Sequence, residues 1–260
     1  MISKSLLEEL LIFSNFLADE AAKITMSFFR NKFDIENKDD FSPVTTADKK
    51  TELKIRKLIN QKYPNHGILA EEFENKNIDS ELLWVIDPID GTRSFVAGHK
   101  DFGTLIALLY KKKPVIGIID CPAHKERWVG VINKPTRFNG KISKTNSKEF
   151  TEDCYALTTG LYLENKKFKK GFDKLIKKIK YFRLGGDCYM YGMLSSGLID
   201  IVIEDTLKAH DYMALVPVIE GAGGIVSDKN ENKISLNSDG SIVASCSKAV
   251  HDKVIKIFNN

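Results

Sequence analysis

Hydrophobic residues recur with the period of a helix over the first part of the chain. Between residues 5 and 29, apolar side chains return every three or four positions, which places them on one helix face. Ser5 and Glu8 stand three positions apart before this stripe, as in a capping box at a helix start. A second amphipathic stretch over 48–61 predicts another helix. The chain is therefore expected to begin with two helices, joined by a polar stretch over 31–42.

Short apolar runs replace the helical period from residue 82 onward. They are rich in β-branched and aromatic residues and are separated by Gly, Pro, Lys or Asn turns, as strands usually are. The turn over 111–114 joins two of them closely, and tight connections favour antiparallel pairing. We predict a meander with strands at 82–86, 104–110, 115–120 and 127–132.

Strand-like and helical patterns alternate in the second half, which indicates another layered α/β unit. A polar stretch over 140–150 separates the halves, so we expect two α/β domains, 1–143 and 144–260. The expected strands are 155–158, 199–204, 225–226 and 241–245, and the expected helices are 165–180, 187–196, 212–220 and 251–258.

One of these helices is strongly basic, with eight lysines within 166–180. Its apolar residues repeat at helical spacing, which favours an amphipathic surface helix with solvated lysines. The alternative is a patch that binds nucleic acid or another anionic surface. Such a patch needs exposed aromatic residues among the lysines, whereas Phe168 and Phe172 lie on the apolar stripe.

Composition and charge narrow the class of protein. The 260 residues are 43% hydrophobic and 28% charged, which excludes disorder, collagen and coiled coil as overall descriptions. The net charge of +4 is too mild to argue for a nucleic-acid or membrane partner. No apolar run approaches the roughly 20 residues of a membrane-spanning helix. Glu8 and Glu9 interrupt the N-terminal stretch, so we expect no signal peptide.

The cysteines are few and scattered. No two of them form a C-x-x-C pair, which argues against a zinc ribbon or a disulfide framework. We therefore expect a cytoplasmic protein in a reducing compartment. The four positions are Cys121, Cys154, Cys188 and Cys246.

The hexapeptide Asp-Pro-Ile-Asp-Gly-Thr over 87–92 carries the strongest chemical indication. It places Asp87 and Asp90 at the end of a strand, where two close carboxylates repel unless a cation lies between them. Mg²⁺ prefers one or two carboxylates together with phosphate and water. Gly91 and Thr92 then offer backbone N–H groups and a hydroxyl for phosphate oxygens. The alternative is that Asp-Pro and Asp-Gly serve only as turn residues.

Three further acidic positions are less informative one at a time. The pair Glu71-Glu72 follows an apolar run and could be an exposed loop. Asp211 precedes the apolar helix expected over 212–220 and could be its N-cap. Asp48 lies three residues after Thr45 and could be an acid in the first turn of a capped helix.

Taken together in this order, the four acidic motifs resemble the inositol monophosphatase superfamily of lithium-sensitive, magnesium-dependent sugar-phosphate phosphatases. The resemblance covers nearly the whole chain. Two positions depart from the family motifs: Ala70 stands where the family has glycine in G-E-E, and His210 where it has tryptophan in W-D-x-x-A. These departures affect local packing more than metal binding, because the acids remain.

The resemblance implies a fold and a set of site residues. The implied fold is a stacked αβαβα sandwich, with an antiparallel sheet in the first half and a mixed sheet in the second. A homodimer and Mg²⁺ are implied as well. Asp48 and Thr92 resemble the pair that orients and deprotonates the attacking water, and Glu71 belongs to the same catalytic group. The implied metal ligands are Glu71, Asp87, the Ile89 carbonyl, Asp90 and Asp211.

Two strings point to one branch of the superfamily. Gly-Thr-Arg-Ser-Phe over 91–95 and Gly-Gly-Asp-Cys-Tyr over 185–189 look like the histidinol-phosphate phosphatase branch, which serves histidine biosynthesis. Histidinol carries an amine and an imidazole, so a carboxylate such as Asp187 or Glu204 makes a suitable partner. Glu204 also falls where the family has a carboxylate that contacts substrate. Arg93 and Arg183 are the other expected substrate contacts.

The sequence leaves three other functions open. One is an inositol or broader sugar-phosphate phosphatase, which a substrate panel would distinguish. A second is a non-catalytic protein that binds anions through the basic helix over 166–180. A glycosidase built on paired carboxylates is a weaker rival, because it would need neither metal nor a phosphate cradle.

Overall fold

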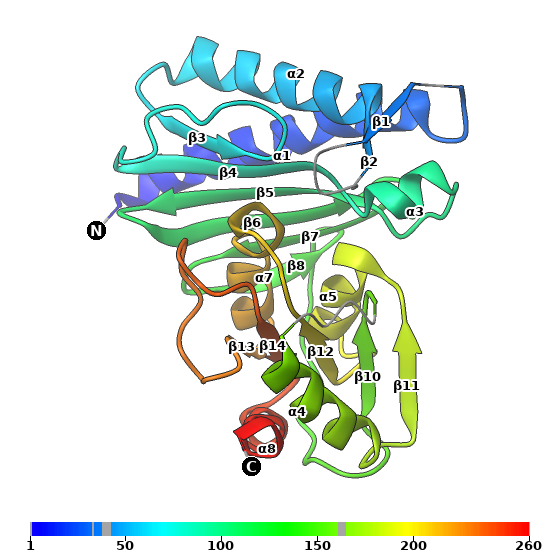
Figure 1. Ribbon diagram of the computed structural model, residues 1–260. Coiled ribbons are helices and arrows are strands. Elements are labelled where there is room, and N and C mark those ends of the chain that lie inside the picture. Colours follow the sequence, from blue (N-terminus) through cyan, green and yellow to red (C-terminus); the bar gives the residue numbers. More distant parts are fainter. Residues whose placement is uncertain (1, 33, 38–42, 161–164, 260) are drawn as a thin grey trace.

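The helices and sheets of the chain are stacked in five layers, α-β-α-β-α, in the computed structural model (Figure 1). The structure describes residues 2–32, 34–37, 43–160 and 165–259. Three clusters of buried apolar residues fill the spaces between successive layers. Within the described ranges, no helix is long and apolar enough to cross a membrane. The layered α/β architecture expected from the sequence is confirmed.

The first layer consists of α1 (Lys4–Phe28) and α2 (Thr46–Lys62), which cover the outer face of the first sheet (Figure 1). Both helices match the amphipathic stripes of the sequence. The start of α1 was predicted incorrectly, because Ser3 rather than Ser5 is the N-cap and accepts the N–H of Leu6. A short antiparallel pair, β1 (Ile35–Asn37) and β2 (Pro43–Thr45), follows α1. β1 lies inside the polar stretch over 31–42, for which no element was predicted, and residues 33 and 38–42 of that stretch lie outside the described part.

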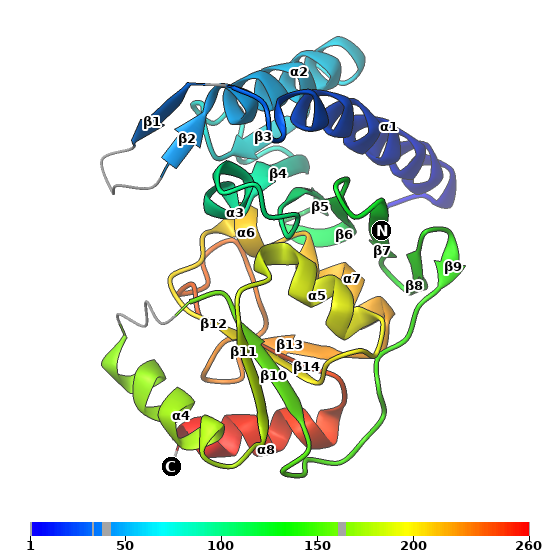
Figure 2. The same cartoon turned by 90° about the vertical axis from the view of Figure 1, so that its right-hand side faces the viewer.

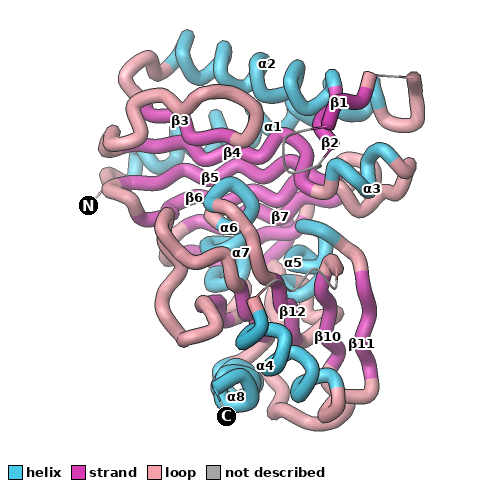
Figure 3. The backbone as a smooth tube through the Cα atoms, in the orientation of Figure 1, coloured by secondary structure: helices cyan, strands magenta, loops and turns pink. Residues whose placement is uncertain are grey.

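A seven-stranded sheet forms the second layer, drawn in magenta in Figure 3. Its order is β3-β4-β5-β6-β7-β8-β9, and all neighbours are antiparallel except β3 and β4, which are parallel. The predicted meander is confirmed, whereas the short strands β3, β8 and β9 were missed. The strands are β3 (Gly67–Ala70), β4 (Leu82–Asp90), β5 (Gly103–Tyr110), β6 (Lys113–Cys121), β7 (Glu126–Val131), β8 (Lys134–Phe138) and β9 (Lys141–Ile142).

The middle layer contains α5 (Asp187–Ser195), α6 (Ala209–Tyr212) and α7 (Leu215–Gly221), which lie between the two sheets (Figure 2). The sequence predicted a single helix over 212–220, and this was wrong. Pro217 explains the interruption, because proline cannot donate to the carbonyl four residues earlier, that of Met213, and its ring crowds that carbonyl. Glycines let α7 approach the sheet closely: a Cβ at Gly130 would lie 2.2 Å from the backbone of Pro217.

The second sheet has the order β11-β10-β12-β14-β13 and is mixed, as expected. Two helices, α4 and α8, cover its outer face (Figure 1). The expected helix over 165–180 ends earlier, and the missed strand β11 follows it. The elements are β10 (Tyr155–Thr158), α4 (Lys166–Ile176), β11 (Tyr181–Leu184), β12 (Ile201–Glu204), β13 (Ile225–Ser227), β14 (Ile242–Ser245) and α8 (Lys248–Asn259).

The apolar stripe of α4 is buried, as its spacing predicted: Phe168 and Phe172 pack against α8 and the sheet. The core between the sheets joins residues of both halves, such as Trp128 of β7 and Tyr191 of α5. A division into domains 1–143 and 144–260 therefore stays a prediction, with β9 and β10 on either side of the proposed boundary.

Candidate active site

A β-bulge in β4 brings the two aspartates of the hexapeptide onto one face. Asp87 pairs with Leu105 of β5, and Asp90 pairs with Gly103, so three residues of β4 match two residues of β5. In a regular strand, positions three apart point to opposite faces. The extra residue cancels this alternation, and both carboxylates therefore point to the same side of the sheet.

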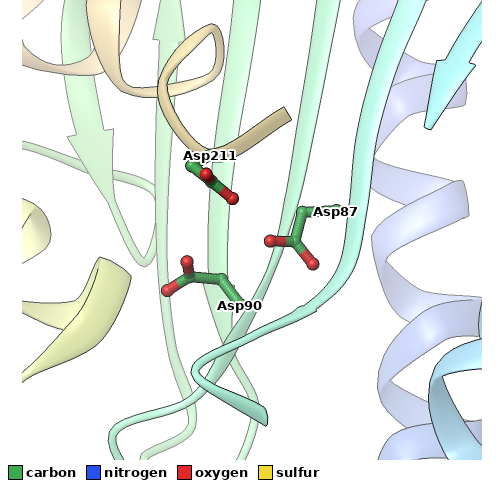
Figure 4. Close-up of side chains that lie close together, drawn as sticks. All are labelled: Asp87, Asp90 and Asp211. Atoms are coloured by element: carbon green, nitrogen blue, oxygen red, sulfur yellow. The ribbon is translucent and has the colours of Figure 1, made fainter. Parts of the chain in front are cut away.

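Asp211 of α6 completes an acidic cluster with these two residues. One carboxylate oxygen from each of Asp87, Asp90 and Asp211 lies within 4.8 Å of the others, and Figure 4 shows the three groups facing one another. Asp211 is the third residue of its helix and accepts the backbone N–H of Lys208 at 2.7 Å. The suggestion that Asp211 is the N-cap of a helix over 212–220 was therefore wrong.

The charges of this cluster oppose one another. Burial and the neighbouring carboxylates of Glu71 and Asp90 raise the pKa of Asp87 well above its usual range. Burial, with repulsion from Asp187 and Asp211, raises the pKa of Asp90 in the same way. Three facing carboxylate oxygens are a donor set that fits a hard divalent cation such as Mg²⁺. A cation there would offset the repulsion.

Two neighbouring groups can extend this donor set. Glu71 lies in the loop after β3 and lines the same cavity. Burial raises the pKa of Asp87, Asp48 and Asp211, and the charge of Glu71 adds to this rise. The Ile89 carbonyl accepts a hydrogen bond from Thr92 Oγ1 at 3.0 Å, and a carbonyl oxygen retains a second lone pair for a cation.

Asp48 is held rigidly beside the cluster. Its Oδ2 accepts the backbone N–H of Thr45 at 2.8 Å and the hydroxyl of Thr45 at 2.5 Å, in the capping box that begins α2. Its Oδ1 faces Thr92 Oγ1 at 3.2 Å. Burial raises the pKa of Asp48. The structural and functional interpretations of Asp48 are thus compatible, because one oxygen caps the helix and the other faces Thr92.

A cavity of about 460 Å³ opens beside these residues, between the end of β4 and the second half of the chain. Gly91 and Thr92, the expected phosphate-binding residues, form its wall at the start of α3 (Thr92–Val96). The lining residues are Glu71, Asp87, Ile89, Asp90, Gly91, Thr92, Arg93, Ser94, Thr159, Gly185, Asp187, Cys188, Tyr191, Glu204, Thr206, Leu207, Lys208, His210 and Asp211.

Asp187 lies next to the end of the hexapeptide, close to Gly91 and Ser94. Its Oδ2 accepts the hydroxyl of Ser94 at 2.5 Å, and its backbone has a left-handed φ of 41° that aspartate tolerates better than most residues. A Cβ at Gly91 would lie only 2.7 Å from the Asp187 carboxyl carbon, so only glycine leaves room there. Burial raises the pKa of Asp187.

Glu204 at the end of β12 provides a second carboxylate in the same wall. Its Oε2 accepts the hydroxyl of Tyr191 at 2.7 Å. Burial raises the pKa of Glu204 to about 7, so the group changes charge near neutral pH. The two arginines differ in position: Arg93 lines the cavity with an exposed side chain, whereas Arg183 is exposed on the edge strand β11 and is not part of the lining.

Sequence reasoning missed several polar residues that line the cavity, namely Ser94, Tyr191, Thr159, Thr206 and Lys208. Ser94 lies inside the string over 91–95 and could have been suspected from its place next to Arg93. Tyr191 is buried in α5 among apolar residues, and only its contact with Glu204 distinguishes it from a core aromatic residue.

Comparison with known proteins identifies the class. The profile of the inositol monophosphatase family matches residues 6–260. The chain is 42% identical over 245 residues to the bifunctional phosphatase IMPL2, chloroplastic, of Arabidopsis thaliana, across 94% of this chain and 71% of that protein. It is 30% identical over 230 residues to a histidinol-phosphatase of Chlorobaculum parvum, across 88% and 89% of the two chains.

The fold leads to the same class. The structure of an inositol monophosphatase from Zymomonas mobilis matches with a TM-score of 0.88 at 42% identity, across 97% of this chain and 98% of that one. Fold, acidic cavity and relatives together define a phosphoric monoester hydrolase. The chain belongs to the inositol monophosphatase family, whose members depend on Mg²⁺.

Proposed function

We propose that this phosphatase uses Mg²⁺ to hydrolyse L-histidinol phosphate to L-histidinol and phosphate, a step of histidine biosynthesis. The observation that carries the choice of substrate is the Asp187 carboxylate, held in the cavity wall by Ser94. An amine is the natural partner of a partly buried carboxylate. Relatives that are histidinol-phosphatases support the same choice.

In this proposal, Asp87, Asp90, Asp211, Glu71 and the Ile89 carbonyl hold the metal. Bound Mg²⁺ would neutralise charge on the phosphoryl group and on the carboxylates, which supplies much of the help for so slow a reaction. The donor set suits this ion, because every candidate ligand atom is an oxygen.

The water is oriented by Thr92 and Asp48. The Thr92 hydroxyl carries one proton, which can point either to Ile89 O at 3.0 Å or to Asp48 Oδ1 at 3.2 Å. When it points to Asp48, a lone pair of Thr92 Oγ1 stays free for another donor. A water on the cavity side can then donate to Thr92 Oγ1, and Asp48 can take up the proton through the Thr92 hydroxyl. Backbone N–H groups at Gly91 and Thr92 bind the phosphate oxygens.

The leaving alcohol of the substrate would extend toward Asp187 and Glu204. Glu204 needs its charge to pair with a cation, and with a pKa of about 7 it gains that charge as the pH rises through neutrality. Arg93 is the nearer of the two arginine candidates, since it lines the cavity. Cytoplasmic location, a homodimer and a two-domain division remain predictions.

An inositol or broader sugar-phosphate phosphatase is the second candidate. The 42% identity to the inositol monophosphatase of Zymomonas mobilis favours it. Inositol is neutral and needs only hydroxyl partners, so this function makes no use of the charge on Asp187.

A phosphate-release assay separates these candidates. Purified protein is given histidinol phosphate, inositol phosphate and glycerol phosphate, each with Mg²⁺ and with EDTA. We expect the highest kcat/KM on histidinol phosphate, loss of activity in EDTA and recovery on adding Mg²⁺. Higher kcat/KM on inositol phosphate would reject the substrate choice, and full activity in EDTA would reject the metal mechanism. No activity on any phosphate would favour a non-catalytic protein.

A further inference from the structure

An ion pair on α2, between the buried Glu52 and the partly buried Arg56, holds the loop that carries Glu71. Glu52 is fully buried, and its Oε1 accepts Nε of Arg56 at 2.6 Å. The same carboxylate accepts two backbone N–H groups of the loop, that of Glu72 at 2.7 Å and that of Phe73 at 3.2 Å. A guanidinium nitrogen of Arg56 donates to the Phe73 carbonyl at 2.9 Å. The peptide bond directly after Glu71 is therefore fixed to α2.

A buried carboxylate is costly unless it is paired and hydrogen-bonded, and Glu52 has both kinds of partner. The loop needs this anchor because negative charges surround Glu71. Glu71 lies near the negative charges of Asp48, Asp87 and Asp211, which repel it from the cluster. Without the anchor, repulsion would favour a loop that carries Glu71 away from the cavity.

We propose that Glu52 and Arg56 are positioning residues, which hold Glu71 in place for a divalent cation without touching the cation themselves. This inference rests on the proposed function, because it requires that the acidic cluster binds Mg²⁺. Glu52 lies one helical turn after Asp48, and residues four apart share a helix face. The same turn of α2 thus orients both the water-activating carboxylate and the metal-binding loop.

The test measures Mg²⁺ binding by titration calorimetry, without substrate, in the wild type, Glu52→Gln and Arg56→Met. Changes to residues that support metal ligands typically weaken metal affinity about 10- to 100-fold. We expect the Kd for Mg²⁺ to rise at least about tenfold in both variants. In the phosphate-release assay, the Mg²⁺ concentration for half-maximal activity should rise equally, with kcat largely recovered at saturating Mg²⁺.

Asp200→Asn is the matched control. Asp200 is also a buried carboxylate, which accepts the backbone N–H of Tyr155 at 2.8 Å and pairs with Lys148 at 2.7 Å. It lies in the second sheet region, next to β10 and outside the cavity lining. Asp200→Asn should lower Tm about as much as Glu52→Gln does and leave the Kd for Mg²⁺ unchanged.

The outcomes separate this inference from the proposed function. If the wild type binds no Mg²⁺, the proposed function fails and the inference fails with it. If the wild type binds Mg²⁺ and Glu52→Gln binds it equally well, with Tm lowered as in Asp200→Asn, the pair is structural only and the inference alone is overturned. Should Glu52→Gln not fold, Arg56→Lys decides: it keeps the charge but loses the fork to Phe73, and an unchanged Kd overturns the inference.

Discussion

Ser94 Oγ donates a hydrogen bond of 2.5 Å to Asp187 Oδ2, although 93 positions separate the two residues. Ser94 belongs to the string over 91–95, and Asp187 belongs to the string over 185–189. The two strings that indicated one branch of the superfamily are therefore in direct contact. Their contact lies in the wall of the acidic cavity, where a substrate amine could reach the carboxylate.

Asp187→Asn should reduce kcat/KM for histidinol phosphate steeply. Removing a carboxylate that pairs with a partly buried cation costs about 2–5 kcal/mol. Glycerol and inositol phosphates lack the amine, so their kcat/KM should barely change. Ser94→Ala keeps the charge but frees the carboxylate, and its loss should be smaller and equally selective. Equal damage on all three substrates would mean that Asp187 has a structural role only.

Asp211→Asn should lower kcat by orders of magnitude with the fold retained. The amide keeps the shape of the side chain and can still accept the Lys208 N–H, but it removes one charge from the cation-binding cluster. Circular dichroism checks the fold, and phosphate release at increasing Mg²⁺ checks the activity. A rate near that of the wild type would mean that Asp211 serves only to accept the Lys208 N–H at the start of α6.

Thr45→Val should lower kcat more than it raises KM. The hydroxyl of Thr45 both caps α2 and holds Asp48 Oδ2, so its loss costs about 1 kcal/mol of stability and frees Asp48 from its alignment with Thr92. Thr45→Ser keeps the hydroxyl and should restore kcat. If Thr45→Val lowers Tm while kcat stays unchanged, Thr45 acts only as a helix cap.

Glu204→Gln should remove a pH-dependent loss of stability in the metal-free protein. The pKa of Glu204 is raised from 4.5 to about 7, so folding favours its protonated form. The stabilisation that comes from this protonated carboxyl is fully present below pH 4.5. As the pH rises to 7, it is lost and the free energy of unfolding falls by about 3 kcal/mol. Urea unfolding from pH 4.5 to 8 should show the free energy of unfolding of Glu204→Gln rising by this amount relative to wild type. Parallel curves would contradict a raised pKa.

Local patterns were sufficient for many elements of the fold. The stripes of α1, α2 and α4, the hairpin between β5 and β6, and the acidic hexapeptide depend on residues that are near one another in sequence. Side-chain periodicity, turn chemistry and repulsion between close carboxylates act over a few residues, so they can be inferred without a fold. The interruption between α6 and α7 could also have been inferred, since Pro217 is visible in the sequence.

Other features depend on neighbours far along the chain. β3 and β11 are short edge strands whose pairing is supplied by β4 and β10, and four-residue apolar runs alone do not distinguish strand from helix. The anchoring role of Glu52 could likewise not be inferred from the sequence, because a glutamate within a helix is normally exposed. The backbone N–H groups that it binds come from the loop after β3.

The sequence by itself determined the residue types of the site: carboxylates at 48, 71, 87, 90 and 211, with Gly91 and Thr92 beside them. Only the tertiary structure decided how they meet. The bulge in β4 turned Asp87 and Asp90 to one face, the packing of α6 brought in Asp211, and Ser94 fixed Asp187 opposite Gly91. The physical reason is the distance along the chain over which each effect acts. Composition and turn chemistry depend on adjacent residues, whereas the relative positions of the charged groups depend on strand register and on layer packing across the whole chain.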